Sequence, residues 1–159
     1  MAEPFDYLFL EPLLVERVRA EVPGLALVGG VPDLAAVADR QQASPAVYLI
    51  YLGDELAAGP QAQGGQGRVQ TVKQLWAAVL ALYCADASGE GEGARREAGP
   101  LLGQLLQALT GWTPRADVEP LTRRQGSAEV AYADGYFYYP LVFQASFVFP
   151  RMRTWQPQP

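Results

Sequence analysis

The aromatic run at residues 136–149 constrains the fold of this chain more than any other segment. Read as a β-strand, it turns alternate side chains to opposite faces. One face carries Phe137, Tyr139, Leu141, Phe143, Ala145, Phe147 and Phe149. The other carries Tyr136, Tyr138, Val142, Gln144, Ser146 and Val148. Pro140 has no N–H to donate, which predicts that this strand either lies at a sheet edge or is bulged there.

Two further long segments predict strands that are apolar on both faces. Residues 46–52 form an almost continuous apolar and β-branched run between Pro45 and Gly53. Such a run is typical of a strand covered on both sides, so we place it in the centre of the sheet. Residues 69–84 alternate with a period of two and are apolar on both faces from Trp76 onward.

Shorter strands and one hairpin complete the predicted sheet. A strand is predicted at residues 25–28, stopped by the two glycines that follow it, and another at residues 118–124. Asp134-Gly135 lies between β-forming residues, which is the strongest short signal for a hairpin. The sequence therefore predicts a hairpin that leads into the final strand.

Two amphipathic helices accompany these strands. The first begins near Pro12, whose fixed φ suits a first helical turn, and ends at Pro23 and Gly24. Its apolar face consists of Leu10, Leu13, Leu14 and Val18. The second ends at Gly111. Its helical stripe consists of Ala98, Leu101, Leu102, Leu105, Leu106 and Leu109. Residues 32–39 are predicted to form a single helical turn.

These elements predict an α+β fold, with a mixed or mainly antiparallel sheet flanked by two main helices. A chain of 159 residues that is 50% hydrophobic fits a single domain with one core. We assign residues 1–150 to this domain and residues 151–159 to a flexible C-terminal tail. Residues 54–68 and 86–93 are rich in glycine with polar residues, so we expect them to be mobile loops.

Composition excludes several classes of function. The formal net charge of -5 and the pI near 4.7 argue against binding nucleic acid or an anionic membrane through a basic surface. The chain has no histidine, which removes the commonest general base and metal ligand. Cys84 is the only cysteine, so no intrachain disulfide can form. We find no membrane span and no basic secretion signal, and expect a cytoplasmic protein.

No motif predicts catalysis, a cofactor or a metal. Residues 64–68 resemble a phosphate-binding loop only superficially, because a strand and not a helix is predicted after them. Asp54 and Glu55 are adjacent in a predicted loop and do not form a positioned pair of carboxylates. Glu90 and Glu92, with Asp86 nearby, could hold a hard cation, but a solvated turn explains them better. We therefore predict a protein that is not an enzyme.

Arginine and tryptophan residues are the candidate contact residues. Pairs of arginines occur at Arg95, Arg96, Arg123, Arg124, Arg151 and Arg153. They form either salt bridges within the subunit or contacts with acidic patches of neighbouring subunits, for which the planar guanidinium is well suited. Trp76 and Trp112 are expected in the core. Trp155 lies beyond the last strand and is the best candidate for an intermolecular anchor.

Residues 8–150 resemble the tail terminator (tail completion) proteins of long-tailed bacteriophages in the order of their elements. The resemblance rests on the N-terminal helix, a short strand, the strand after Ser44-Pro45, a glycine-rich insertion, the Trp76 strand, the helix ending in Leu109-Thr110-Gly111-Trp112-Thr113-Pro114, and the hairpin closing with Tyr139-Pro140-Leu141-Val142-Phe143. It implies a subunit that forms a hexameric ring on the last ring of the tail tube. Such a ring stops tube growth and presents a surface to the head-tail connector.

The resemblance also implies the partners and suggests where they bind. The partners would be further copies of the chain, the tail tube protein and the connector, with DNA only passing through the lumen and no membrane. Such a protein would belong to the virion tail and, during assembly, to the host cytoplasm. Contacts with subunits or the tube are expected at Arg123, Arg124, Arg151 and Trp155. Carboxylates that repel DNA phosphates in the lumen are expected at Glu55, Glu90 and Glu92. The alternatives are another head-tail adaptor of the virion and a small non-catalytic binding domain.

Overall fold

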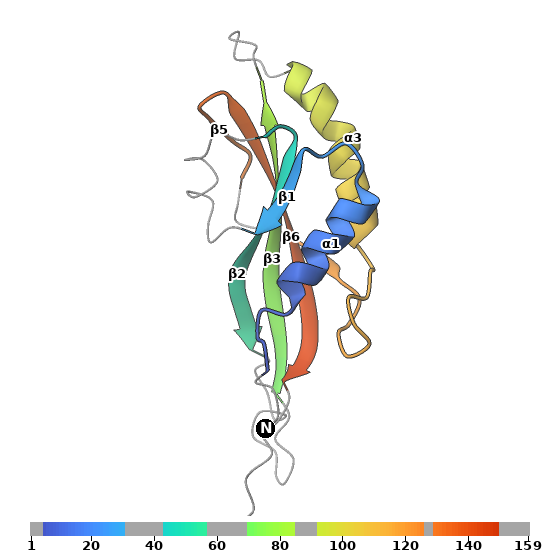
Figure 1. Cartoon of the computed structure of the whole chain (residues 1–159). Coiled ribbons are helices and arrows are strands. Elements are labelled where there is room, and N and C mark those ends of the chain that lie inside the picture. The colour runs from blue at the N-terminus through green and yellow to red at the C-terminus, as the bar shows by residue number, and fades with distance from the viewer. Residues whose placement is uncertain (1–4, 31–42, 57–69, 85–91, 126–128, 150–159) are drawn as a thin grey trace, which may run out of the picture.

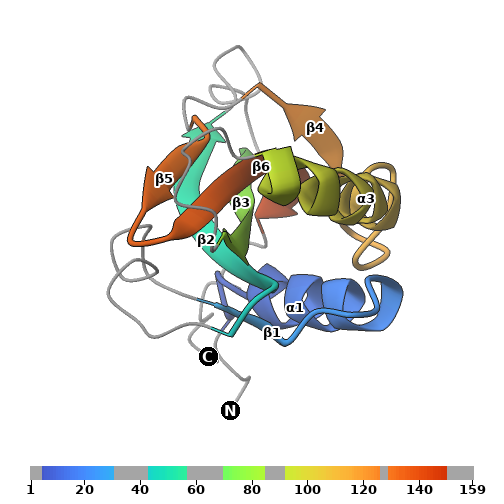
Figure 2. The same cartoon turned by 90° about the horizontal axis from the view of Figure 1, so that it is seen from above.

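The computed structural model describes residues 5–30, 43–56, 70–84, 92–125 and 129–149. Within these residues, two helices cover one face of a six-stranded mixed sheet (Figures 1 and 2). The elements are α1 (Leu10–Glu21), β1 (Leu27–Gly30), β2 (Ala46–Leu56), β3 (Gln70–Tyr83), α3 (Glu92–Leu109), β4 (Thr122–Arg124), β5 (Ala131–Ala133) and β6 (Tyr136–Phe149). The predicted α+β fold with two main helices is confirmed.

The sheet has the strand order β1-β2-β3-β6-β4, with β5 paired to β6 beside β4. Only β1 and β2 are parallel, and every other pair is antiparallel. The centre is occupied by β3, which pairs along its whole length with β6. Our placement of residues 46–52 in the centre was therefore wrong by one strand, because β2 has only the short β1 on its outer side.

Apolar side chains fill a core on each face of the sheet. The larger core lies between the sheet and the helices and includes Leu14, Trp76, Leu105 and Phe143. The smaller core lies on the opposite face and includes Tyr48, Ile50, Ala77, Val79, Ala81 and Tyr138. Successive residues of β2 and β3 alternate between these two cores, and all of residues 76–82 are buried. The prediction of two-faced apolar strands is confirmed.

The helices follow the predicted stripes. Leu10, Leu14 and Val18 are the buried residues of α1. In α3, Leu105 and Leu109 are fully buried, and the helix is followed by Gly111 with φ +75°, a conformation that favours glycine. The start of α3 differs from the prediction, because Glu92 and Gly93 belong to the helix and not to the expected loop at residues 86–93.

Three strand boundaries also differ from the prediction. β2 continues to Leu56, so residues 54–56 belong to a strand and not to a loop, because they pair with β3 below a bulge near Gly53. β1 includes the two glycines that were expected to stop it, since all four of its residues pair with β2. At residues 118–124 only Thr122–Arg124 form a strand, with an isolated bridge at Val118. Pro120 lies between them and has no N–H for a ladder.

Pro140 pairs with β3 on one side, but it has no described strand beside it on the other. Its register with Val79 of β3 is continuous with that of its neighbours, so β6 is not bulged there. On the other side, β5 pairs with residues 136–138 and β4 with residues 142–144. No described strand faces Pro140 on that side. β6 is therefore not an edge strand. Proline is tolerated at position 140 because no described strand needs its N–H there.

Some predictions concern residues that the structure does not describe. These are the helical turn at residues 32–39, most of the loops at residues 54–68 and 86–93, and the tail at residues 151–159. The domain boundaries and the mobility of the loops stay predictions.

Candidate functional site: the assembly surfaces

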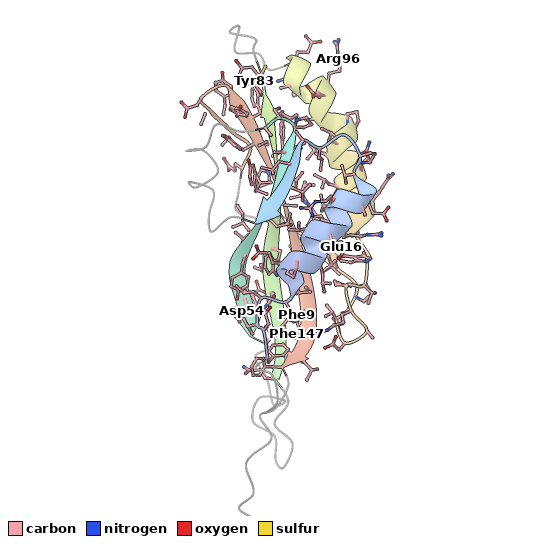
Figure 3. The ribbon with its side chains drawn as sticks, in the orientation of Figure 1. Phe9, Glu16, Asp54, Tyr83, Arg96 and Phe147 are labelled. Carbon is pink, nitrogen blue, oxygen red and sulfur yellow. The ribbon has the colours of Figure 1, made fainter. Side chains whose placement is uncertain are left out.

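The subunit is elongated along β2, β3 and β6 (Figure 1). One of its ends carries an aromatic cluster. We call this the phenylalanine end, defined by Phe5, Tyr7, Phe9, Phe147 and Phe149. Ring centroids are 5.5 Å apart for Phe5 and Phe149 and 5.2 Å for Phe9 and Phe147. The cluster joins the start of the described chain to the end of β6. Phe9 and Phe147 lie close together at this end in Figure 3.

The phenylalanine end is partly open to solvent. Phe5 is 38% exposed and Phe149 is 39% exposed, and Leu8 and Val148 are exposed as well. An exposed guanidinium packs on one ring of the cluster, since the Cζ of Arg115 lies 3.8 Å from the centroid of the Phe9 ring. The same guanidinium donates two hydrogen bonds to Asp117, of 2.5 and 2.7 Å. An apolar surface of this kind is typical of a contact with another molecule.

The opposite end of the subunit carries tyrosines. We call it the tyrosine end, defined by Tyr83, Val130, Tyr132 and Tyr136. Tyr83 and Tyr132 are more than half exposed, and the rings of Tyr83 and Tyr136 are 5.2 Å apart. Figure 3 places Tyr83 at the far end from Phe147.

The predicted hairpin builds the tyrosine end. Asp134 and Gly135 both have positive φ, 52° and 85°, as a tight turn with Asp-Gly requires. The N–H of Cys84 donates to the carbonyl of Gly135, which ties the hairpin to the end of β3. The hairpin prediction from Asp134-Gly135 is confirmed.

Asp54 lies in the open part of β2 and is held by two tyrosines. The hydroxyl of Tyr7 donates to its Oδ2 at 2.8 Å, and the hydroxyl of Tyr51 donates to its Oδ1. These hydrogen bonds, that from Tyr51 above all, lower the pKa of the Asp54 carboxyl. Burial, followed by the Asp54 contact, raises the pKa of Tyr51 and of Tyr7. The result is an ionised, oriented carboxylate at the surface.

The structure brings together two candidate residues that the sequence had assigned to different roles. Arg124, expected at a subunit contact, forms an ion pair of 3.2 Å with Glu55, expected in the lumen. Arg124 also donates to Gln144 at 2.5 Å, and Gln144 donates to Ser146 at 3.0 Å. The two charges therefore largely compensate each other on the face of the sheet that carries no helix.

The remaining candidates are spread over the molecule. Arg123 is exposed on β4, with its Cζ 5.8 Å from the Phe143 ring centroid. Glu92 is exposed at the start of α3 and forms an ion pair of 3.0 Å with Arg96. Figure 3 shows Arg96 and Asp54 at opposite ends of the subunit, so the structure does not bring Glu92 near Glu55. Glu90, Arg151 and Trp155 lie outside the described residues.

The structure adds contacts that sequence reasoning missed. The sequence presents Asp54 only as a neighbour of Glu55, whereas its partner Tyr7 lies on another segment and its partner Tyr51 lies across a bulge. Arg17 was not singled out, although its Nε donates to the carbonyl of Ala108 at 3.1 Å near the end of α3. No local sequence pattern marks these contacts, because they join residues that only the fold places together.

Within the described parts of the chain, no group of three His, Cys, Asp or Glu side chains could hold a metal ion. None of the described helices is long and apolar enough to cross a membrane.

Comparison with known proteins identifies the family. The family described as phage tail terminator protein matches residues 1–156. The chain belongs to the phage tail terminator family. Tail terminators are structural proteins of the virion, so this chain has a structural role in a phage tail.

The fold of this tail terminator is also found in a solved virion structure. It superposes on a chain from the structure titled "Virion of native gene transfer agent (GTA) particle" with a TM-score of 0.54 and 16% sequence identity. The match covers 88% of this chain and 95% of that one. At this identity the comparison supports the fold alone. No curated protein matches the chain.

Proposed function

We propose that this tail terminator forms a closed ring, of six subunits, on the last ring of the tail tube. The ring stops growth of the tube and presents its other side to the head-tail connector, without catalysis. The family match over residues 1–156 carries this proposal. The geometry supports it, because the elongated subunit has exposed aromatic side chains at both ends (Figure 3).

The two ends are suited to the two axial junctions. Aromatic side chains are enriched in protein contacts because they bury a large area at a small entropic cost. If the long axis of each subunit runs along the tail, the ring presents a circle of Phe5 and Phe149 on one side and a circle of Tyr83 and Tyr132 on the other. The tube protein and the connector then bind at opposite sides. The proposed setting is the virion tail, after assembly in the host cytoplasm.

The lumen proposal is narrowed by the positions of the carboxylates. Glu55, Glu90 and Glu92 were proposed to line the channel and to let DNA pass without binding. Because Glu92 begins α3 at the far end from Asp54, Glu55 and Glu92 can face the lumen only as two circles at different heights. Glu55 is also partly neutralised by Arg124. Glu92 is also paired, with Arg96, but its side chain is 72% exposed against 47% for Glu55, and so exposed a pair is weak. Glu92 is therefore the better described candidate for repelling phosphates.

The arginines proposed for subunit contacts also differ in whether they have a partner within the subunit. Arg124 is engaged within the subunit, while Arg123 has an exposed guanidinium on the outermost strand of the sheet. We therefore favour Arg123 over Arg124 as a contact between subunits. Arg151 and Trp155 stay proposals from the sequence.

Deletion of the gene tests the function. We expect tails of irregular length that do not join heads, as seen by negative-stain electron microscopy of the lysate, and restoration by a plasmid copy of the wild-type gene. Images of the purified protein on isolated tail tubes should show one ring at the tube end. Tails of normal length that join heads would contradict the terminator role and favour a non-catalytic binding domain. Tails of normal length that fail to join heads would favour another head-tail adaptor.

A further inference from the structure

Within the described residues, the sheet has two edge stretches without a paired strand at the same level, one on β2 and one on β4. β1 pairs with residues 46–49 of β2, and no described strand pairs with β2 beyond them on that side. On the other side β4 is the last strand. The register places Tyr51, Trp76, Phe143 and Arg123 in one row across β2, β3, β6 and β4. The unpaired stretch of β2 and the strand β4 therefore lie at the same height along the sheet.

On the β2 edge, the carboxylate of Asp54 has no cationic partner among the described residues. Asp54 accepts hydrogen bonds from Tyr7 and Tyr51, and it forms no ion pair with any described residue. Its orientation is set by two hydroxyl donors, so little side-chain freedom remains to be lost when a cation binds. The carboxylate is exposed and ionised. Asp54 is thus a pre-oriented acceptor at the open edge of β2.

On the β4 edge, the guanidinium of Arg123 has no carboxylate partner in the part of the chain that the structure describes. Arg123 is exposed and, among the described residues, contacts the Phe143 ring but no acidic group. The N–H of Leu121 donates to Trp112, and its carbonyl accepts from Gly111. Successive residues of a strand direct these groups to alternate sides. The backbone N–H and carbonyl of Arg123 therefore point the same way as those of Leu121, away from β6 and toward the open edge.

The two charges also lie on the same face of the sheet. Asp54 is in register with Gln74, and Arg123 with Phe143, and both of these partners lie on the side covered by the helices. Their rows are two positions apart. In a continuous sheet, a diagonal offset of two residues on adjacent strands separates the side chains by roughly 7–8 Å, which long side chains span.

We propose that β4 of one copy of this chain packs against the open edge of β2 in the next copy, with Arg123 of one copy donating to Asp54 of the other. This contact rests on the ring put forward above and names the surfaces that close it. It is heterologous, because each copy uses β2 on one side and β4 on the other, and such contacts close into a ring by rotation. Arg124, the other charged residue of β4, keeps its ion pair with Glu55 of the same subunit.

The local shape of β2 makes this edge selective. A bulge near Leu52 interrupts the register, and Gly53 adopts φ +106°. Bulges and charges on an edge prevent pairing with unrelated strands. A short partner such as β4, whose three residues carry two arginines, suits the segment between the bulge and the end of β2. Charge complementarity then selects a second copy of this chain.

Charge exchange tests the contact. Full-length Asp54→Arg and Arg123→Asp are purified, and their fold is checked by circular dichroism and thermal unfolding. Their assembly is measured by analytical ultracentrifugation and native mass spectrometry. Each single variant should associate at least about tenfold more weakly than the wild type, because like charges then face each other. The double variant should recover, and raising the salt concentration should weaken the wild-type contact. Glu16→Arg, an equal change of charge at an exposed position on α1, should assemble as the wild type does.

Mixing the two single variants gives a sharper result. In an alternating ring, every contact pairs opposite charges, so the mixture should assemble although neither variant does so alone. Only a ring with an even number of subunits can alternate fully, and a hexamer can. Asp54→Asn keeps an acceptor for the tyrosines and should weaken association without loss of fold, which covers the case in which Asp54→Arg does not fold.

The outcomes separate this contact from the ring itself. Wild-type rings together with normal assembly of folded Arg123→Asp and Asp54→Asn would overturn the contact and leave the ring in place. Failure of the double variant and of the mixture to recover, with both proteins folded, would also overturn it. A wild-type chain that stays monomeric, alone and on tail tubes, would overturn both proposals.

Discussion

At the scale of single residues, polar side chains join elements that are far apart in the chain. The Nε of Arg17 on α1 donates to the carbonyl of Ala108 near the end of α3, where last-turn carbonyls have no partner within the helix. The Cζ of Arg17 also lies 5.4 Å from the centroid of the Trp112 ring. On the same helix, Arg19 donates to the carbonyl of Val28 on β1 at 3.1 Å. Two arginines thus connect α1 to α3 and to β1.

The tyrosines around Asp54 predict a pH dependence. Tyr51→Phe and Tyr7→Phe should each raise the pKa of the Asp54 carboxyl toward its ordinary value, Tyr51→Phe more strongly because its hydrogen bond is the larger cause of the shift. A carboxyl whose pKa is lowered on folding stabilises the fold above its unfolded pKa of about 3.9, and this contribution is lost as the pH falls through the lower folded value. Asp54→Asn should therefore be less stable than the wild type at pH 7.

Carbon-detected NMR titration of Asp54, with chemical denaturation at pH 7 and near pH 2, measures both effects. The difference in stability between Asp54→Asn and the wild type should shrink at the acidic pH. An unchanged pKa of Asp54 in Tyr51→Phe would contradict the interpretation. So would a stability difference that does not depend on pH.

At the scale of elements, α3 is anchored to the sheet by a few leucines. Leu105 and Leu109 are fully buried, whereas Leu101, Leu102 and Leu106 are only partly buried. The predicted stripe is confirmed, and its buried centre is narrower than the sequence pattern. The reason is that α3 packs against α1 as well as against β3, so one side of its stripe lies at the margin of the core.

Leu105→Ala should reduce the free energy of unfolding by about 2–5 kcal/mol, because it leaves a cavity between α3 and β3. Leu27→Ala is the matched control, since Leu27 is 42% exposed on β1 and should lose only about 1 kcal/mol or less. Urea denaturation followed by circular dichroism measures both. A loss under about 0.5 kcal/mol for Leu105→Ala would place α3 outside the core.

At the scale of the whole molecule, the elongated sheet separates three kinds of surface. The phenylalanine end and the tyrosine end lie at the two tips, as Phe147 and Tyr83 show in Figure 3. The charged edges belong to β2 and β4, with Asp54 placed beside the phenylalanine end by its hydrogen bond from Tyr7. A ring component of a tail needs lateral contacts with its own copies and two axial contacts with different partners. The subunit therefore offers a separate surface for each proposed junction.

Substitutions at the two ends should have separable effects. Phe149→Glu and Tyr132→Glu should each leave the isolated ring intact and break a different axial junction, one with the tube and one with the connector. A charge in an apolar contact is costly because it has no partner there. Pull-down of tail tubes and of connector-bearing heads with each variant ring measures the outcome. Loss of the same junction in both variants would contradict the assignment of one partner to each end.

Much of the fold followed from the sequence because its signals are local. Alternation of side chains with a period of two marked the two faces of β3 and β6, a continuous apolar run marked β2, and the stripe of leucines marked α3. Asp134-Gly135 placed the hairpin because few residues tolerate its backbone angles. The same local signals, together with the order of elements, led to the tail terminator family, and the absence of histidine pointed away from catalysis.

The candidate surfaces were decided only by the tertiary structure, because they depend on the register between distant strands. The sequence led us to expect Glu55 in the lumen and Arg124 at a subunit contact, whereas the fold brings the two side chains together in one ion pair. Sequence treated Asp54 as part of a loop, and pairing with β3 placed it on an open edge between Tyr7 and Tyr51. Composition determined that the chain is acidic and apolar enough to fold as one unit. Which charges are neutralised within the subunit, and which stay open to a neighbour, is set by non-local pairing that no single segment encodes.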